Sequence, residues 1–243
     1  MKKMNWNLAI PLCLLSLSAG SVQAAYKVLD GGVADGGTLV GQITLDGVAP
    51  EPEMLIADED TEACGGDRPA QNLLVDSAGG VQNVILSIEG VDSGKPWGFS
   101  EEFYYDQKNC TFVPRVLLIQ PGNAGVVHNS DSVGHNFHTI SKGTFNTNKK
   151  INADSEMAVP KNKIRRPGLV RVKCDIHSWM KGWWLVAANP YASVTNENGK
   201  FSIADIPPGS YTVKIWHETL GESEQSVVVE ANKDTELNIS LGL

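Results

Sequence analysis

The sequence is poor in basic residues and in cysteine, and beyond its first 24 residues it contains no long apolar run. Only 20 lysines and arginines stand against 28 acidic residues. An acidic surface does not favour nucleic acid or anionic lipid as a partner, although it leaves room for a cationic protein. No later segment approaches the roughly 20 apolar residues of a membrane-spanning helix. The composition therefore excludes a basic nucleic-acid-binding protein and predicts no transmembrane segment.

The first 24 residues have the organisation of a secretory signal peptide. Lys2 and Lys3 precede an apolar run from Leu8 to Leu17, and Val22-Gln23-Ala24 offers a small-residue cleavage site. Removing residues 1–24 takes away two lysines and no acid, which leaves 18 basic against 28 acidic side chains and a formal charge of −10. We therefore expect an exported protein, located in the bacterial periplasm.

Three of the four cysteines lie after this leader: Cys64, Cys110 and Cys174. Thiols tend to pair in an oxidising compartment, but an odd count leaves one unpaired. If a metal or a buried pocket protects Cys174, Cys64 and Cys110 form the natural disulfide. Other pairings remain open, because sequence alone does not give connectivity.

Helical periodicity is also scarce after residue 25. Short runs rich in valine, isoleucine, threonine and aromatic residues recur between turn-forming clusters, as in TLVGQITLDG and QSVVVEANKD. Pro121-Gly122, Asn198-Gly199 and Pro208-Gly209 mark turns in which proline fixes φ or glycine accepts a positive φ. The sequence therefore predicts an all-β protein.

The segment VTNENGKFSIADIPPGSYTVKIWH (194–217) resembles the later half of a carboxypeptidase-regulatory-like domain, a transthyretin-like β-sandwich. The earlier half of that pattern lies far upstream, at 41–50 and 80–88. This resemblance implies a discontinuous domain made of residues 25–96 and 189–243, with residues 97–188 inserted into one of its surface loops. The alternative is three consecutive pieces, with residues 26–96 folding separately.

The stretch KCDIHSWM (173–180) brings a cysteine, a histidine and a methionine together at three-residue intervals. On a strand Cys174, His177 and Met180 would alternate between faces, whereas in a tight loop they can converge. Thiolate and thioether are soft ligands that suit copper, and a His₂Cys set with a weak axial methionine is an electron-transfer geometry. Zinc could occupy a Cys-His-His set, and each side chain alone could be ordinary core.

The segment GHNFHT and the C-x-x-H-x-x-M spacing resemble the ligand loops of the cupredoxins, the latter with the spacing of amicyanin. The resemblance runs over 112–186, an inserted Greek-key β-sandwich. It implies that Asn136 ties the two ligand loops together by hydrogen bonds. His138 is the competitor for the first imidazole, on the expectation that it shares a strand face with His135. The implied ligands of one type 1 copper ion are His135, Cys174, His177 and Met180.

Four protein ligands leave no open position for substrate, so the resemblance implies a one-electron carrier or redox subunit and not an enzyme. Its partner would be a redox protein such as a c-type cytochrome or a periplasmic oxidoreductase. Trp179 and Trp183 are the candidates for a docking surface, and His128 and His217 are interpreted as structural. The alternatives are a copper-binding or copper-delivery protein and a metal-free cell-surface binding module.

Overall fold

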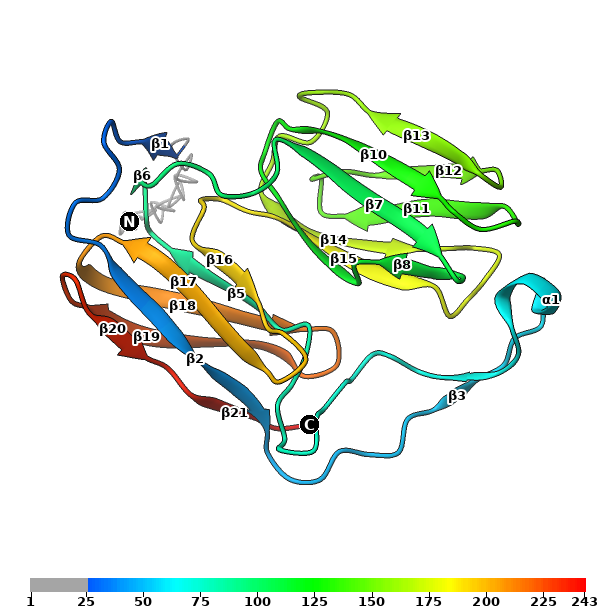
Figure 1. Ribbon diagram of the computed structural model, residues 1–243, viewed down its shortest axis with the longest axis horizontal. Coiled ribbons are helices and arrows are strands. Elements are labelled where there is room, and N and C mark those ends of the chain that lie inside the picture. Colours follow the sequence, from blue (N-terminus) through cyan, green and yellow to red (C-terminus); the bar gives the residue numbers. More distant parts are fainter. Residues whose placement is uncertain (1–25) are drawn as a thin grey trace, which may run out of the picture.

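The computed structural model describes residues 26–243, which form strands arranged in two β-sandwiches (Figure 1). The expected signal peptide, residues 1–24, lies outside the described residues. Within 26–243 the helical structure is the four-residue α1, and no helix there is long and apolar enough to cross a membrane. The all-β class is confirmed.

The elements follow one another along the chain in the order β1 to β21, with α1 between β3 and β4. Their bounds are β1 (Lys27–Val28), β2 (Gly37–Leu45), β3 (Met54–Leu55), α1 (Thr61–Cys64), β4 (Arg68–Pro69), β5 (Ile85–Glu89), β6 (Ser93–Gly94), β7 (Glu102–Lys108), β8 (Thr111–Val113), β9 (Val116–Ile119), β10 (Ala124–Asn129), β11 (His135–Ser141), β12 (Thr147–Ile151), β13 (Ser155–Val159), β14 (Gly168–Lys173), β15 (Lys181–Val186), β16 (Ala192–Val194), β17 (Lys200–Ile206), β18 (Gly209–His217), β19 (Gly221–Val229), β20 (Asp234–Glu236) and β21 (Ile239–Leu241).

The first sandwich combines strands from both ends of the chain. One sheet has the order β16-β5-β18-β19, and the other has the order β17-β2-β20 with β21 also paired to β2. In β18 Val213 and Ile215 face the interior while Lys214 between them is exposed, which is the alternation expected of a half-buried strand. Leu39 and Ile43 of β2 complete this core from the opposite sheet.

The second sandwich contains only strands from the middle of the chain. Its sheets have the orders β13-β10-β7-β8 and β12-β11-β14-β15-β9. Trp184 of β15 is fully buried at its centre, where its ring contacts Phe103, Tyr105 and Phe137. Aromatic burial on this scale is a large share of the apolar free energy of a small sandwich. We propose from this topology that the second sandwich is inserted into the first.

One segment does not pack where the expected boundaries place it. Between β2 and β5 the chain leaves the first sandwich and runs along the second, carrying β3, α1 and β4 (Figure 1). We call residues 53–70 the strap. Cys64 of the strap belongs to the core of the second sandwich, and Leu55 and Ala57 pack against that core. The segment 25–96 is therefore shared between the two sandwiches.

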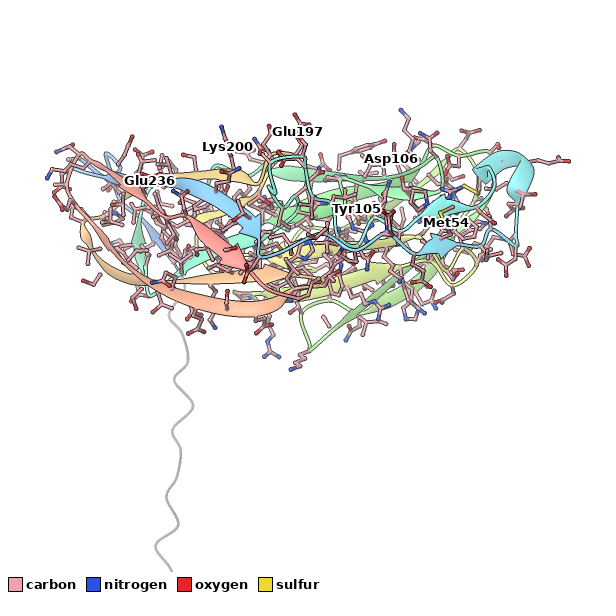
Figure 2. The ribbon with its side chains drawn as sticks, turned by 90° about the horizontal axis from the view of Figure 1, so that it is seen from below. Met54, Tyr105, Asp106, Glu197, Lys200 and Glu236 are labelled. Carbon is pink, nitrogen blue, oxygen red and sulfur yellow. A yellow bond between two sulfur atoms is a disulfide. The ribbon has the colours of Figure 1, made fainter. Side chains whose placement is uncertain are left out.

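Figure 2 shows the same division from below: Met54 of the strap lies at the end of the molecule that holds Tyr105 and Asp106, and Glu236 lies at the other end. The two sandwiches also contact each other directly. Arg115 Nε lies 2.6 Å from Glu218 Oε1, and both side chains are largely buried. The rings of Trp183 and Trp216 meet at 4.6 Å between centroids.

Candidate metal centre

The first histidine of the candidate site is positioned by a strand. His135 is the first residue of β11, in which His135, Phe137 and Thr139 face the interior. The strand pairs with β12 on one side and β14 on the other, so its register is fixed from both directions. His135 has no exposed surface.

The other ligand candidates lie in the tight loop between β14 and β15. The Cys174 amide donates to the Met180 carbonyl at 3.2 Å, and the Met180 amide donates to the His177 carbonyl at 3.0 Å. Two backbone amides, from His177 at 3.4 Å and Asn136 at 3.2 Å, donate to Cys174 Sγ. These bonds close the loop on itself and fix the sulfur against the start of β11. All three side chains are buried.

The donor atoms converge on one another. His135 Nδ1 lies 2.8 Å from His177 Nδ1, and Cys174 Sγ lies 3.9 Å from the same nitrogen of His177. All three donor atoms lie within 4.8 Å of one another. The site is therefore compact enough for a single ion, since zinc bonds to nitrogen and sulfur measure about 2.0–2.3 Å.

Two carboxylates fix the tautomers of the His135 and His177 rings, and so decide which ring nitrogen carries the proton. His135 Nε2 lies 2.8 Å from Asp131 Oδ2, and His177 Nε2 lies 3.0 Å from Asp60 Oδ2. An ionised carboxylate only accepts hydrogen bonds, so each Nε2 carries the proton that it donates. In neutral rings both Nδ1 atoms then carry lone pairs.

Burial favours the neutral ring at His135. Desolvation lowers the pKa of His135 below its usual value, although the hydrogen bond with Asp131 opposes this shift. Two lone pairs that face each other at 2.8 Å repel, and within the described residues neither accepts a backbone amide or hydroxyl. A cation between them removes this repulsion. Histidine ligands of metals have the same feature, a second N–H held by a carboxylate.

Met180 stands at the sequence position expected of the fourth ligand, three residues after His177. It closes the loop through its backbone, and its side chain is 1% exposed. Imidazole, thiolate and thioether together are a soft donor set that suits copper better than zinc or calcium. The residues present thus fit the copper ion that the sequence pattern implies.

The structure does not bring His138 to this centre. The expectation that His138 shares the face of His135 is wrong, because the two residues are three apart on β11 and point to opposite faces. The His138 side chain is 27% exposed and lies 2.9 Å from Asp175 Oδ2. His138 therefore belongs to a surface polar group.

Asn136 makes hydrogen bonds that link the two ligand loops. Its backbone amide, rather than its side chain, donates to Cys174 Sγ. Its side-chain amide donates to Asn148 Oδ1 at 3.0 Å, and Asn148 in turn donates to Asp175 Oδ2 at 2.8 Å. The side chain reaches the ligand loop only through this relay.

The cysteine pairing is the one predicted on the condition that Cys174 is protected. Cys64 and Cys110 form a disulfide, whereas Cys174 is free and buried. Cys64 Sγ lies 3.9 Å from His177 Nε2, so the disulfide borders the metal centre. Because the sulfur of Cys110 is engaged in this bond, its closeness to Asp131 and His135 does not make a second metal site.

The two tryptophans predicted as a docking surface make contacts within the molecule. Trp179 is 6% exposed: its Nε1 donates to the Cys110 carbonyl at 3.1 Å, and the guanidinium of Arg68, in the strap, lies 5.1 Å from its ring centroid. Trp183 is directed at Trp216 in the other sandwich. Both residues therefore make internal contacts.

The two carboxylates escaped the sequence reasoning. Asp131 stands four residues before His135. It also accepts the amides of Asn109 at 2.6 Å and Cys110 at 2.8 Å. Asp60 is separated from His177 by 117 positions, and no local pattern connects them.

The other two histidines lie outside the centre. His128 stacks on Tyr104 at 6.0 Å between centroids and bonds to Ser130 at 3.0 Å. His217 is buried in the first sandwich, where its Nδ1 accepts the amides of Thr219 and Leu220, each at 3.3 Å. Neither ring joins a group of metal-ligand side chains.

Comparison with known families supports the assignment of the C-terminal segment. Residues 186–242 match the carboxypeptidase regulatory-like domain family, which confirms the prediction for that part of the chain. No curated protein matches the chain significantly in sequence.

Solved structures similar to this chain include several copper proteins. A purple cupredoxin from Nitrosopumilus maritimus aligns over 35% of this chain and 98% of its own, with 21% identity and a TM-score of 0.29. A Cu(I) form of an amicyanin variant aligns over 42% of this chain and 97% of its own, with 14% identity and a TM-score of 0.31.

The copper-containing nitrite reductase from Thermus scotoductus SA-01 aligns over 35% of this chain at 22% identity, with a TM-score of 0.32. This match spans only 22% of the nitrite reductase chain. With scores this low, an assignment of function rests on the geometry of the site.

Proposed function

We propose that this protein binds one copper ion through His135, Cys174, His177 and Met180, as a type 1 centre, and transfers single electrons. The observation that carries the proposal is the pair of imidazole Nδ1 atoms facing each other at 2.8 Å beside a free thiol, with both Nε2 atoms bonded to carboxylates. Bound copper would supply the Cu(II)/Cu(I) couple.

The protein residues keep the donor set rigid. Asp131 and Asp60 hold the two rings in one tautomer, and the amides of Asn136 and His177 hold the sulfur. A rigid set of donors lowers the rearrangement that accompanies a change of oxidation state. Four protein ligands leave no position for substrate, which favours an electron carrier or redox subunit over a catalyst.

The proposal includes a location and a partner. A signal peptide at residues 1–24 would export the chain to the periplasm, where the Cys64–Cys110 disulfide is stable. A redox protein such as a c-type cytochrome or a periplasmic oxidoreductase would exchange electrons with it. The first sandwich would act as a scaffold, since its fold alone assigns no chemistry.

The test is a titration of metal-free residues 25–243 with Cu(II), followed by visible spectroscopy. We expect an intense thiolate-to-copper band at one equivalent, bleached reversibly by a reductant and absent in Cys174→Ser. His138→Ala is the matched control, because this histidine lies on the same strand but faces outward. It should retain the band.

Two other outcomes would replace the proposal. Tight binding of Cu(I) without a coloured Cu(II) form would indicate copper handling or delivery. Absence of copper binding would indicate a β-sandwich module whose ligand-like residues are structural.

A further inference from the structure

The strap closes the side of the metal centre on which His177 lies. Asp60 Oδ2 lies 3.0 Å from His177 Nε2, and Cys64 Sγ lies 3.9 Å from the same nitrogen. The Trp179 ring packs against the imidazole at 5.1 Å between centroids. His177 consequently has no exposed surface, although it lies in a loop at the end of two strands.

The acidic side chain and the disulfide are parts of one small structural unit. The amides of Ala63 and Cys64 both donate to the Asp60 carbonyl, at 3.0 and 2.8 Å, and so form the turn of α1. Asp60 has a φ of 48°, in the left-handed region that aspartate and asparagine tolerate better than most residues. Fixing Cys64 to Cys110 thus fixes the Asp60 carboxylate over the ring.

The disulfide is the main attachment of this part of the strap. Every residue from 58 to 63 is exposed, so apolar burial contributes little to holding it. Arg68 adds a contact with the Trp179 ring, a bond to the Asn109 carbonyl at 3.3 Å and a bond to the Cys64 carbonyl. A segment with few buried contacts opens readily unless it is tied.

We propose that the strap is a cap on the metal centre, in which Asp60 is a positioning residue for His177 and the Cys64–Cys110 disulfide is the latch. The role of the cap in protecting bound copper rests on the proposed function. With the cap closed, metal chelators and small redox reagents do not reach the imidazole edge of His177. A redox partner meets the strap itself.

The first test uses metal-free protein, so it does not depend on copper. Histidines are modified with diethyl pyrocarbonate, and the rate at each residue is followed by mass spectrometry. In the unaltered protein His177 should react as slowly as buried His217, and His138 should react fast. In Cys64→Ser/Cys110→Ser we expect His177 to react about tenfold faster or more, with His217 unchanged.

Two outcomes of this experiment overturn the cap. In one, His177 reacts as fast as His138 in the unaltered protein. In the other, His177 stays as protected as His217 after the disulfide is removed. An equal acceleration at His217 would indicate general unfolding, and Asp60→Ala then decides: it should accelerate His177 alone if the carboxylate covers the ring.

The second test uses the copper-loaded protein and three single substitutions on the strap. Asp60→Asn removes the negative charge but keeps the size of the side chain and its tolerance for positive φ. Asp60→Glu retains the negative charge on a longer side chain. Glu62→Gln removes a negative charge from an exposed residue two positions away. We expect Asp60→Asn to accelerate copper removal by a chelator about tenfold and to raise the reduction potential. Asp60→Glu should recover part of both effects, and Glu62→Gln should show neither.

The two proposals fail in different ways. If Glu62→Gln reproduces the shifts of Asp60→Asn, the effect is surface charge and Asp60 does not position the ring. If the protein binds no copper but the modification pattern is as expected, the cap stands and the electron-transfer function is wrong.

Discussion

The two sandwiches each bury a histidine almost completely, and the partners of the rings distinguish a structural histidine from a ligand candidate. His217 in the first sandwich is 2% exposed and His177 in the second is 0% exposed. Two backbone amides donate to the Nδ1 lone pair of His217. The corresponding lone pair of His177 faces another imidazole and a thiol. Burial alone therefore does not indicate a metal site, whereas a buried lone pair that faces a second imidazole and a thiol, with no backbone amide bonded to it, does.

The same contrast extends to the other buried polar groups of the first sandwich. Thr195 donates to the Val81 carbonyl at 2.7 Å and accepts the Val84 amide at 2.9 Å. Asn189 makes equivalent bonds with the backbone of Ile88 and Tyr191. These side chains complete the main-chain hydrogen bonding of loops, which is a structural task. The convergent group of metal-ligand side chains lies in the second sandwich.

The largest expected effect is a loss of stability that is confined to the second sandwich when its disulfide is removed. Cys64→Ser/Cys110→Ser removes a cross-link over 46 positions, and the loss should lower the free energy of unfolding of the second sandwich by about 2–5 kcal/mol. The first sandwich lacks this cross-link and should keep its stability. Amide hydrogen exchange measures the two stabilities separately, through β10 and β11 for the second sandwich and β5 and β18 for the first. Equal losses in both would show that they unfold as one unit.

A substitution of His217, the structural histidine, should affect stability without affecting copper binding. His217→Leu leaves the amides of Thr219 and Leu220 without an acceptor, which should lower the free energy of unfolding by about 1–3 kcal/mol. Copper affinity should not change. Denaturant unfolding and the Cu(II) titration measure the two quantities. A loss of copper binding without a loss of stability would contradict the division of roles.

The pH dependence of stability should also carry a contribution from His217. Burial lowers the pKa of this ring, and Arg115 lowers it further while Glu218 opposes the shift. The unfolded chain then binds a proton more readily than the folded one, so stability falls as the pH drops below the unfolded value of about 6.5. His217→Gln should flatten that part of the profile, measured by denaturant unfolding between pH 5 and 8. An unchanged slope would show that other groups dominate.

The smallest effect concerns the surface group beside the ligand loop. Bonds from Lys173 and then His138 lower the pKa of Asp175 to about 2. Lys173→Ala should raise that pKa toward the ordinary value, which NMR titration of the carboxyl carbon would show. Because each side chain of this pair is 33% exposed at the surface, copper binding and global stability should be nearly unchanged. A clear loss of copper binding would show that the pair of Lys173 and Asp175 contributes to the metal centre.

The sequence was informative where the chemistry is local. Cys174, His177 and Met180 lie within seven residues, so their spacing alone predicted a converging loop. The alternation of β11 also excludes His138, because a separation of three residues from His135 places the two side chains on opposite faces of the strand. The strap was not predictable, because Asp60 meets His177 across 117 positions through a tertiary contact. Arg68 of the strap likewise covers Trp179 through a tertiary contact.

The central claim is that one copper ion lies between the two Nδ1 atoms and Cys174 Sγ. A crystal structure of the copper-loaded protein, with anomalous scattering recorded at the copper edge, tests it most directly. We predict a single anomalous peak within bonding distance of His135 Nδ1, His177 Nδ1 and Cys174 Sγ, with Asp60 and Asp131 still bonded to the two Nε2 atoms. A peak at His138 and Asp175, or coordination through Nε2, would contradict the account.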